Sequence, residues 1–461
     1  MMRMKTIYGE PAVIRRIERR SALHDLTSNG TVAAAFMVGA ALLALVVANT
    51  PAYEPIEHFL KMPLEVGIGP FGVALSVETF VNDFLMAIFF LLVGVELKYE
   101  MTVGQLRRPR QAALPMLAAA GGVAVPALIY LALNAGQPTI GGWAVPIATD
   151  IAFALGVVSL LGDRIAPETK VFFQTLAIAD DLLAIVVIAL FYGQSLSLGW
   201  CLATLGAVAV LVGLNRARIY SLRPYLVVGL VLWICMFNSG IHATLSGVIL
   251  AFALPSVSDV RLDHLGDWLQ RRARNLEDTY DDEHHVLGQH DFTEGALRVE
   301  HVMHHVTPPL QRMENHVSVF VNFLVLPLFA FVNAQVRFVG ADLAAVAASP
   351  VAHGAWLGAV LGKPLGIVLV TWLLVKVGFA KLPKNMDWVQ VGAVGIMGGL
   401  GFTMSILISG LAFTSPADVM AAKCAILLGS VSSALIGIAF VMLSTRRRRS
   451  AGDSRPGRRV S

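Results

Sequence analysis

Long runs of apolar residues recur along nearly the whole chain. A helix of about 20 predominantly apolar residues is long enough to cross the hydrocarbon core of a bilayer. Of the 461 residues, 56% are hydrophobic and only 14% are charged, whereas soluble domains average about 25% charged. The sequence therefore predicts an all-α polytopic membrane protein with about twelve transmembrane helices. They are placed at residues 31–50, 79–97, 112–134, 143–161, 169–192, 198–214, 222–237, 240–256, 316–335, 350–376, 388–411 and 418–443.

Basic residues lie almost entirely on one side of this topology. All but four of the 35 Lys and Arg residues fall in the two terminal segments or at the alternate loops on the same side. Cytoplasmic loops carry such an excess, so both termini are predicted to be cytoplasmic. The predicted parts are an N-terminal segment (1–30), a transmembrane domain (31–443) and a basic tail (444–461). Because the basic residues flank membrane spans, we expect lipid around the protein and no nucleic-acid partner.

Two connections between the predicted spans are long. Residues 61–76 place β-branched residues around a Gly-Pro turn, which predicts a short outward β-hairpin between the first two spans. Its exposed edge could pair with a second subunit and give a homodimer. The other connection, 257–315, is cytoplasmic and highly charged, and we expect a solvated, partly disordered insert. Metal binding or pH sensing by its histidines is the alternative. These are His284, His285, His290, His301, His304 and His305.

Two adjacent aspartates, Asp180 and Asp181, lie inside the otherwise apolar run from Thr175 to Tyr192. An ionisable residue at this depth costs about 2.5–3.5 kcal/mol on insertion scales. Packing does not require such a pair, so it must line water, bind a cation or proton, or pair with a buried base. Each option indicates ion transport. The two side chains point about 100° apart on a helix, which favours different roles: one coordinates a cation and the other pairs with a neighbour such as Lys363.

Two of the predicted spans contain helix-breaking residues near mid-depth. In the fourth, Pro146, Thr149 and Asp150 fall within five positions, and in the eleventh a cluster of glycines precedes Thr403. Interrupted helices in corresponding positions of two halves predict inverted repeats, here spans 3–5 and 10–12. An interruption leaves unpaired N–H and C=O groups with the matching dipole charges. We expect Asp150 to compensate the half-helix N-termini and a buried Lys363 to compensate the C-termini.

The same residues could hold a cation. A hard cation such as Na⁺ prefers oxygen ligands, by extension from the rule for Ca²⁺ and Mg²⁺. The carboxylates of Asp180 and Asp181, the Thr149 hydroxyl and released backbone carbonyls would supply them. Na⁺ would be transported cargo at this site, and no cofactor is predicted.

Seven segments of the chain stand out as a set. They are VNDFLMAIFFLLVGVELKYE (81–100), PIATDIAFALGV (146–157), LAIADDLLAIVVIALFY (176–192), SGIHATLSGV (239–248), LPLFAFVNA (326–334), GKPLGI (362–367) and GLGFTMSI (399–406). Together, in this order, they resemble the NhaA family of bacterial sodium/proton antiporters over roughly residues 30–443. That family is a standard example of inverted repeats with interrupted helices, so the repeat prediction is not independent of the resemblance.

The resemblance implies roles for individual residues. Asp180 and Asp181 would form the cation and proton site with Thr149 close by, while Asp150 and Lys363 would hold the crossed helices together. Lys363 would itself pair with Asp180. The implied pH-response residues are Glu96, Glu100, His242 and Glu314, and the implied accessory residue is Asp83. From the residues alone, Glu96 and Glu100 could equally be an interfacial charge cluster, and His242 a hydrogen-bonded packing residue.

The activity implied by the resemblance is electrogenic export of Na⁺ or Li⁺ against two protons in the bacterial inner membrane, switched on at alkaline pH. The chain departs from the family near Glu314, where Asn315 and Ser318 replace residues that are often histidine, with His316 nearby as a substitute. This departure bears on the pH set-point and not on the transport reaction. Phe84 and Leu183 stand where glycine is common.

Three other functions fit the sequence less well than antiport does. An intramembrane aspartyl protease also uses two aspartates, but Asp180 and Asp181 follow Ala179 and lack the GxGD pattern of such enzymes. A passive cation channel fits interrupted helices and a buried Lys363 less well than a carrier does. A carrier of organic anions would have to bind its substrate beside adjacent acids that repel it. We therefore expect a secondary transporter and not an enzyme.

Overall fold

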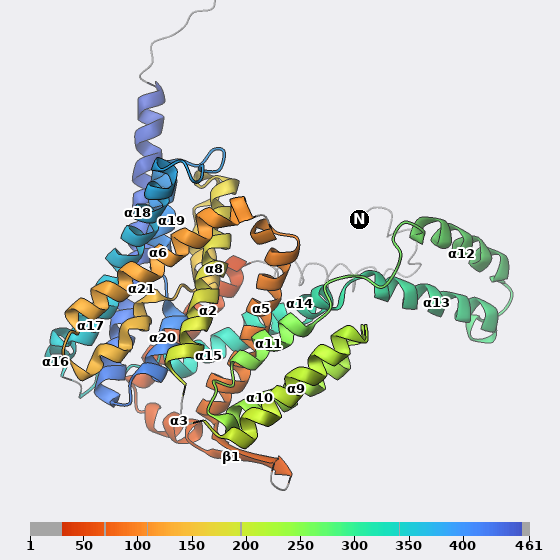
Figure 1. The fold of residues 1–461 in the computed structure, drawn as a ribbon, viewed down its shortest axis with the longest axis horizontal. Coiled ribbons are helices and arrows are strands. Elements are labelled where there is room, and N and C mark those ends of the chain that lie inside the picture. Colours follow the sequence, from red (N-terminus) through yellow and green to blue (C-terminus); the bar gives the residue numbers. More distant parts are fainter. Residues whose placement is uncertain (1–29, 69–70, 108, 194–195, 341, 454–461) are drawn as a thin grey trace, which may run out of the picture.

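The structure is a computed structural model that describes residues 30–453 except 69–70, 108, 194–195 and 341. The predicted N-terminal segment and the end of the basic tail therefore lie outside the described residues. The described chain is mostly helical (Figure 1), and it contains nine helices long and apolar enough to cross a membrane. Six are continuous: α2 (Gly30–Ala48), α6 (Pro109–Leu133), α8 (Pro167–Phe191), α9 (Leu198–Arg216), α10 (Leu222–Ser239) and α21 (Pro416–Asp453).

The other three long helices each contain a π-helical stretch. They are α4-η2-α5 (Val77–Thr79, Phe80–Leu85, Met86–Thr102), α14-η7-α15 (Pro309–Phe320, Val321–Val325, Leu326–Asn333) and α17-η8-α18 (Pro350–Leu357, Gly358–Gly362, Lys363–Lys376). Two of the stretches directly precede a proline at the second position of the next helix, Pro327 or Pro364. Proline lacks an N–H and its ring clashes with a carbonyl one turn earlier. A π-helical turn accommodates that clash without ending the helix, and such turns are frequent at functional sites.

Two further spans are broken, as the sequence predicts. η4 (Pro138–Ile147) and α7 (Ile151–Leu160) meet at 43°, and α19 (Trp388–Gly398) and α20 (Phe402–Ala412) meet at 44°. Counting each bent pair as one span gives eleven candidate spans in the described part of the chain. A polytopic helical membrane protein is therefore confirmed. The inverted repeats and the number twelve stay predictions.

The predicted eighth span differs most from expectation. Its helix, α11 (Leu245–Ala253), has only nine residues, too few to cross a membrane alone. Nevertheless, the end of α11 and the start of α10 lie on the same side of the bundle, because the residues next to each of them contact α14. There the N–H of Leu310 donates to the Pro255 carbonyl at 3.1 Å, and the Arg312 guanidinium donates to the Tyr220 carbonyl at 2.6 Å. An apolar run of span length thus includes only a short helix, which is preceded by a turn and followed by the extended residue Leu254.

The predicted hairpin between the first two spans is confirmed. β1 (Pro63–Ile68) pairs antiparallel with β2 (Phe71–Ser76), with Val66 opposite Val73. Its Gly-Pro turn lies outside the described residues. Pairing of this hairpin with a second subunit stays a prediction. The remaining short elements are α3 (Tyr53–Leu60), α16 (Leu343–Ala348), η3 (Gln105–Arg107), η5 (Gly162–Arg164) and η6 (Val286–Gly288).

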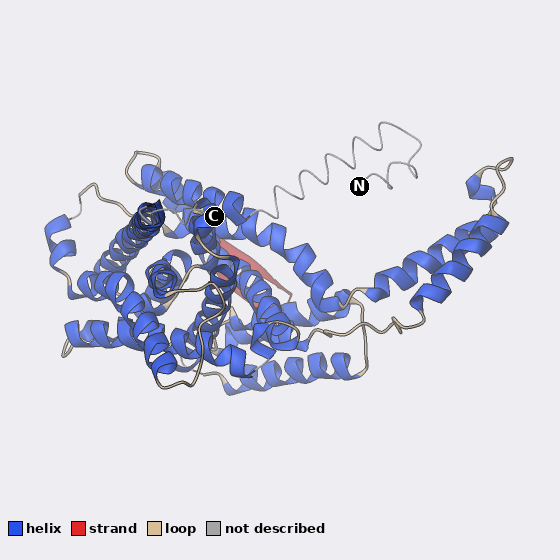
Figure 2. Ribbon diagram, turned by 90° about the horizontal axis from the view of Figure 1, so that it is seen from above, coloured by secondary structure: helices blue, strands red, loops and turns tan. Residues whose placement is uncertain are grey.

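The charged insert is folded where we expected partial disorder. It forms two helices, α12 (Leu265–Thr279) and α13 (His290–Val306), that pack side by side and extend away from the helix bundle (Figures 1 and 2). Gly295 of α13 lies against the Leu276 side chain of α12. No group of three or more His, Cys, Asp or Glu side chains in the described residues, the insert included, has the arrangement of a metal site.

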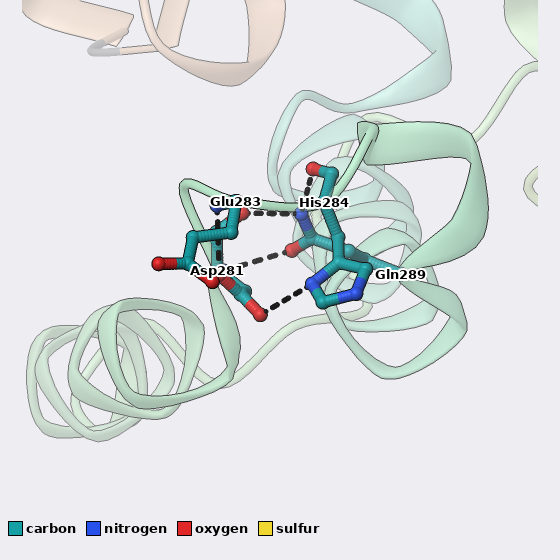
Figure 3. Close-up of polar contacts among 4 residues, drawn as sticks. All are labelled: Asp281, Glu283, His284 and Gln289. Carbon is teal, nitrogen blue, oxygen red and sulfur yellow. Dashed lines mark hydrogen bonds and ion pairs between the residues drawn. The ribbon is translucent and has the colours of Figure 1, made fainter.

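Hydrogen bonds close the turn between these two helices (Figure 3). The Gln289 side-chain amide donates to the carbonyls of Asp281 and His284, both at 2.7 Å, and its oxygen accepts from the Asp281 N–H. The Asp281 carboxylate accepts from the Glu283 N–H at 2.8 Å and contacts Nδ1 of His284 at 2.7 Å. These bonds lower the pKa of Asp281, because they favour its ionised form. The turn is therefore a specific structure, which explains how so polar a segment can join two packed helices.

The base of this helical hairpin meets α14 through a histidine and an arginine. Nε2 of His304 contacts the Arg312 guanidinium, and Nδ1 of His305 bonds to the Asp259 carboxylate at 2.7 Å. Partial desolvation, reinforced by the charge of Arg312, lowers the pKa of the His304 imidazole. The docked arrangement therefore favours the neutral imidazole.

We expect docking of the α12–α13 hairpin on α14 to weaken as the pH falls. A histidine whose pKa is lowered by docking takes up protons more readily when undocked, so protonation below the ordinary pKa of about 6.5 favours separation. Hydrogen–deuterium exchange of residues 290–306, corrected for intrinsic amide rates, should show weaker protection at about pH 5.5 than at about pH 8. The variant His304→Asn should lose most of this pH dependence. An unchanged pH dependence in that variant would contradict the assignment.

Candidate functional site

The two helix interruptions touch each other. Extended residues Ala148 to Asp150 separate η4 from α7, and Gly399 to Gly401 separate α19 from α20. The Asp150 N–H donates to the Leu400 carbonyl at 2.6 Å, which bonds one interruption to the other. A Cβ at Gly401 would lie 2.6 Å from the Ala148 carbonyl oxygen, so this close approach of two backbones requires glycine. The glycine cluster of the sequence thus has a structural purpose where the two spans cross.

Asp150 caps both helices that start at the crossing. One carboxylate oxygen accepts from the Phe153 N–H of α7 at 3.0 Å. The other accepts from the Thr403 N–H of α20 at 3.1 Å and from the Thr403 hydroxyl at 2.7 Å. Helix N-termini carry unpaired N–H groups and partial positive charge, so one buried carboxylate stabilises both. The structure therefore places the Asp150 carboxylate at two half-helix N-termini.

Lys363 is the buried base of the site and is only 1% exposed. It begins α18, directly after the π-helical stretch η8. Its ammonium group donates to Oδ2 of Asp180 at 2.5 Å and also to the Thr149 hydroxyl. That hydroxyl in turn donates to the Gly398 carbonyl at 2.9 Å, at the C-terminal end of α19. The ammonium is thus linked through one hydroxyl to the C-terminal end of α19. Its positive charge is favourable there, because a helix C-terminus carries partial negative charge.

Asp180 and Asp181 lie on α8 and are 1% and 2% exposed. Asp180 faces Lys363, whereas Asp181 lines a cavity of about 130 Å³. Its Oδ1 atom has no hydrogen-bond partner among the described residues. The two aspartates therefore diverge, as helix geometry requires: one is paired with the buried base and the other faces a space large enough for several waters.

This arrangement leaves the site short of positive charge. Asp150, Asp180 and Asp181 carry three negative charges when all are ionised, and Lys363 supplies one positive charge. The four half-helix ends at the crossing add opposite partial charges that cancel. Buried charge without a partner is costly, so cations or protons are needed to balance the remaining carboxylates. Chemically the site can hold a small cation, a proton, or both in turn.

Comparison with known proteins decides the family. Residues 24–441 match the family model described as Na⁺/H⁺ antiporter 1. The chain is 40% identical over 444 residues to a protein named Na⁺/H⁺ antiporter NhaA from Caulobacter vibrioides, which covers 96% of both chains. It is 41% identical over 412 residues to the protein of that name from Oleidesulfovibrio alaskensis, covering 89% of this chain and 91% of the other. The chain belongs to the Na⁺/H⁺ antiporter 1 family.

A third relative agrees with this membership. The protein named Na⁺/H⁺ antiporter NhaA from Helicobacter pylori strain G27 is 42% identical over 414 residues, covering 88% of this chain and 92% of the other. The resemblance stated from the sequence segments is thereby confirmed. Family membership supports a multi-pass membrane transporter that exchanges Na⁺ and H⁺, and it speaks against an enzyme.

The residues that the NhaA resemblance implies for pH response do not gather in one place. Glu96 lines the same cavity as Asp181 and lies within electrostatic range of Glu100 and Glu314. His242 instead lies beyond the end of α10, where Nε2 contacts the Tyr192 carbonyl at 2.5 Å. This contact agrees with the alternative in which His242 is a hydrogen-bonded packing residue. Asp83 lies in η2 and does not line the cavity.

Two polar residues of the site are not among those that the sequence predicts. Thr403 follows the glycine cluster in the sequence, and in the structure its hydroxyl and N–H both hold Asp150. Its position just after a helix break is the sequence signal for this role. Asn322 lines the cavity with Asp181. It is a lone amide in the apolar stretch VFVNFLVLP, and such residues in a membrane span are functional candidates.

Proposed function

We propose that the chain exports Na⁺, or Li⁺, in exchange for protons by alternating access around one acidic site in the bacterial inner membrane, with both termini cytoplasmic. The observation that carries the proposal is Asp181. Its carboxylate is almost fully buried, faces a cavity, and lies beside a pair that already uses the buried base. Such a carboxylate is stable when a cation or proton shares the site.

In this mechanism Na⁺ and protons compete for Asp181 and Asp180. Na⁺ would bind the Asp181 carboxylate together with the Thr149 hydroxyl and water in the cavity, since hard cations take oxygen ligands. Protonation of the same carboxylate removes the negative charge that holds the cation. A site loaded with either species reorients, whereas an empty site with uncompensated charge does not. Protons then enter from outside down their gradient, and Na⁺ leaves the cell.

The charge count supports electrogenic exchange of two protons for one Na⁺. With Asp150, Asp180 and Asp181 ionised and Lys363 protonated, the cluster has an excess of two negative charges. Two protons would cancel this excess, and one Na⁺ would cancel half of it. A cycle that carries two protons inward and one Na⁺ outward moves one net charge. The membrane potential would therefore assist export by about 2.3 kcal/mol per 100 mV.

Activation at alkaline pH is supported by the acids near the cavity. Glu96 lines it, and Glu100 and Glu314 lie close enough to Glu96 for their charges to interact. The combined field of these acids would attract cations toward Asp181. Protons compete with Na⁺ for the Asp181 carboxylate, and a rising pH makes them scarcer.

The proposal is tested by ion exchange in membrane vesicles containing the whole chain. With a fluorescent pH dye and an imposed proton gradient, Na⁺ and Li⁺ should each discharge the gradient, and K⁺ should not. Activity should increase from about pH 6.5 to about pH 8.5, and the apparent affinity for Na⁺ should weaken as the pH falls because protons compete for the same carboxylates. A cation flux without proton movement would indicate a channel and would overturn the proposal.

A further inference from the structure

The cavity beside Asp181 is lined by polar groups that make hydrogen bonds and by polar groups that make none within the described part of the chain. Its polar lining consists of Glu96, Thr149, Asp150, Asp181, Asn322 and Thr403. Three of these are engaged at the helix crossing, since Thr149, Asp150 and Thr403 bond to one another's helices or to Lys363. Glu96, Asp181 and Asn322 have no hydrogen-bond partner among the described residues. The cavity therefore has two acids and one neutral amide with unused oxygen atoms.

Asn322 is a polar residue within an otherwise apolar part of a membrane span. It is half-buried and belongs to the π-helical stretch η7, in a span that is apolar on both sides of it. Polar side chains inside membrane spans are rare and usually face the bundle interior or a water-filled cavity, or pair with another polar group. The nearby asparagine Asn333 is paired, because its amide donates to the Asn82 side chain at 2.6 Å and to the Phe329 carbonyl at 3.1 Å. Asn322 instead lines the cavity.

We infer that Asn322 is a cation-binding residue: its side-chain oxygen is a neutral ligand for the Na⁺ that binds Asp181 in this cavity. This inference rests on the proposed function and adds a ligand to that site. A partly dehydrated Na⁺ needs several oxygen ligands, and one carboxylate with one hydroxyl leaves the shell incomplete. A neutral oxygen completes the shell without adding negative charge to a cluster that already has an excess. It also leaves the proton count unchanged, because an amide does not titrate.

Two variants of nearly the same size separate the role of the oxygen from the role of packing. Asn322→Leu removes the oxygen, and Asn322→Asp keeps an oxygen in the same place. In vesicles at about pH 8.5, we expect Asn322→Leu to raise the KM for Na⁺ about fivefold to tenfold with little change in the maximal rate, the effect of losing one neutral polar contact. Asn322→Asp should keep a KM at or below that of the unaltered chain. Asn238→Leu is the matched control, because the Asn238 amide bonds to its own helix at the Ile234 carbonyl.

The outcomes distinguish this inference from the proposed function. If the unaltered chain exchanges Na⁺ but Asn322→Leu keeps its KM, the ligand role is wrong and the proposed function stands. An equal rise of KM in Asn322→Leu and Asn322→Asp would show that only packing matters, and would also overturn the inference. If the unaltered chain shows no Na⁺-dependent proton movement, the proposed function itself fails. Calorimetric titration of Na⁺ into the purified protein gives a second measurement, in which Asn322→Leu should raise the Kd by the same factor.

Discussion

Replacing Asp181 with asparagine should abolish Na⁺-dependent proton exchange, with a loss of at least about 100-fold. The amide keeps the size of the side chain but removes both the negative ligand and the group that binds the proton. The loss of a contact to a charged group alone corresponds to about 1.5–3 kcal/mol, a factor of about 12 to 160, and the loss of the proton-binding group adds to it. Proton movement after addition of Na⁺ or Li⁺ to vesicles measures the effect.

The stability of the same variant is the control for a direct role. Asp181 has no hydrogen-bond partner at Oδ1 among the described residues and is not the partner of Lys363, so Asp181→Asn should keep the thermal stability of the protein in detergent. Asp180→Asn should lose exchange and also stability, because it leaves the Lys363 ammonium without its carboxylate. Asp267→Asn on the exposed helix α12 should change neither property. Substantial exchange by Asp181→Asn would refute the site.

The membrane fold was predictable from the long apolar runs. The charged cluster was predictable because a charged residue is costly to bury and is therefore rare within such a run. Asp150, Asp180, Asp181 and Lys363 each interrupt a run that is otherwise apolar. Helix geometry alone required that the two adjacent aspartates diverge. It did not say which one meets the base. That assignment came from the resemblance, and the structure has the Lys363 ammonium 2.5 Å from Asp180.

The eighth span and the insert were not predictable from composition. Apolarity measures how many residues can lie in lipid, but a left-handed Gly240 ends α10 and the following turn delays the start of α11 until Leu245. In the insert, the average charge hides apolar residues at helical spacing, including Leu265, Trp268, Leu269 and Leu276. Residues at this spacing share one side of a helix, and Leu276 among them contacts Gly295 of α13. The high average charge of the insert therefore predicted disorder, although the segment forms two helices that pack together.

Breaking the buried ion pair should cause the largest loss of stability. Lys363→Met leaves the Asp180 carboxylate, 1% exposed, without its base. Removing one partner of a buried pair costs about 3–5 kcal/mol, because the other charge is left uncompensated. The double variant Lys363→Met/Asp180→Asn removes both charges and should regain most of this loss. SDS titration in detergent micelles would give the unfolding free energies of the unaltered chain, the two single variants and the double variant. The control variant Lys381→Met, in an exposed loop, should stay within about 0.5 kcal/mol of the unaltered protein.

The double variant identifies the cause of that loss. If the ammonium and carboxylate interact directly, the two single losses are not additive, and the interaction energy of the cycle should reach a few kcal/mol. Additive losses would instead reflect the lost packing of the lysine stem. In that case Lys363 would hold α18 in place without compensating charge at the helix crossing.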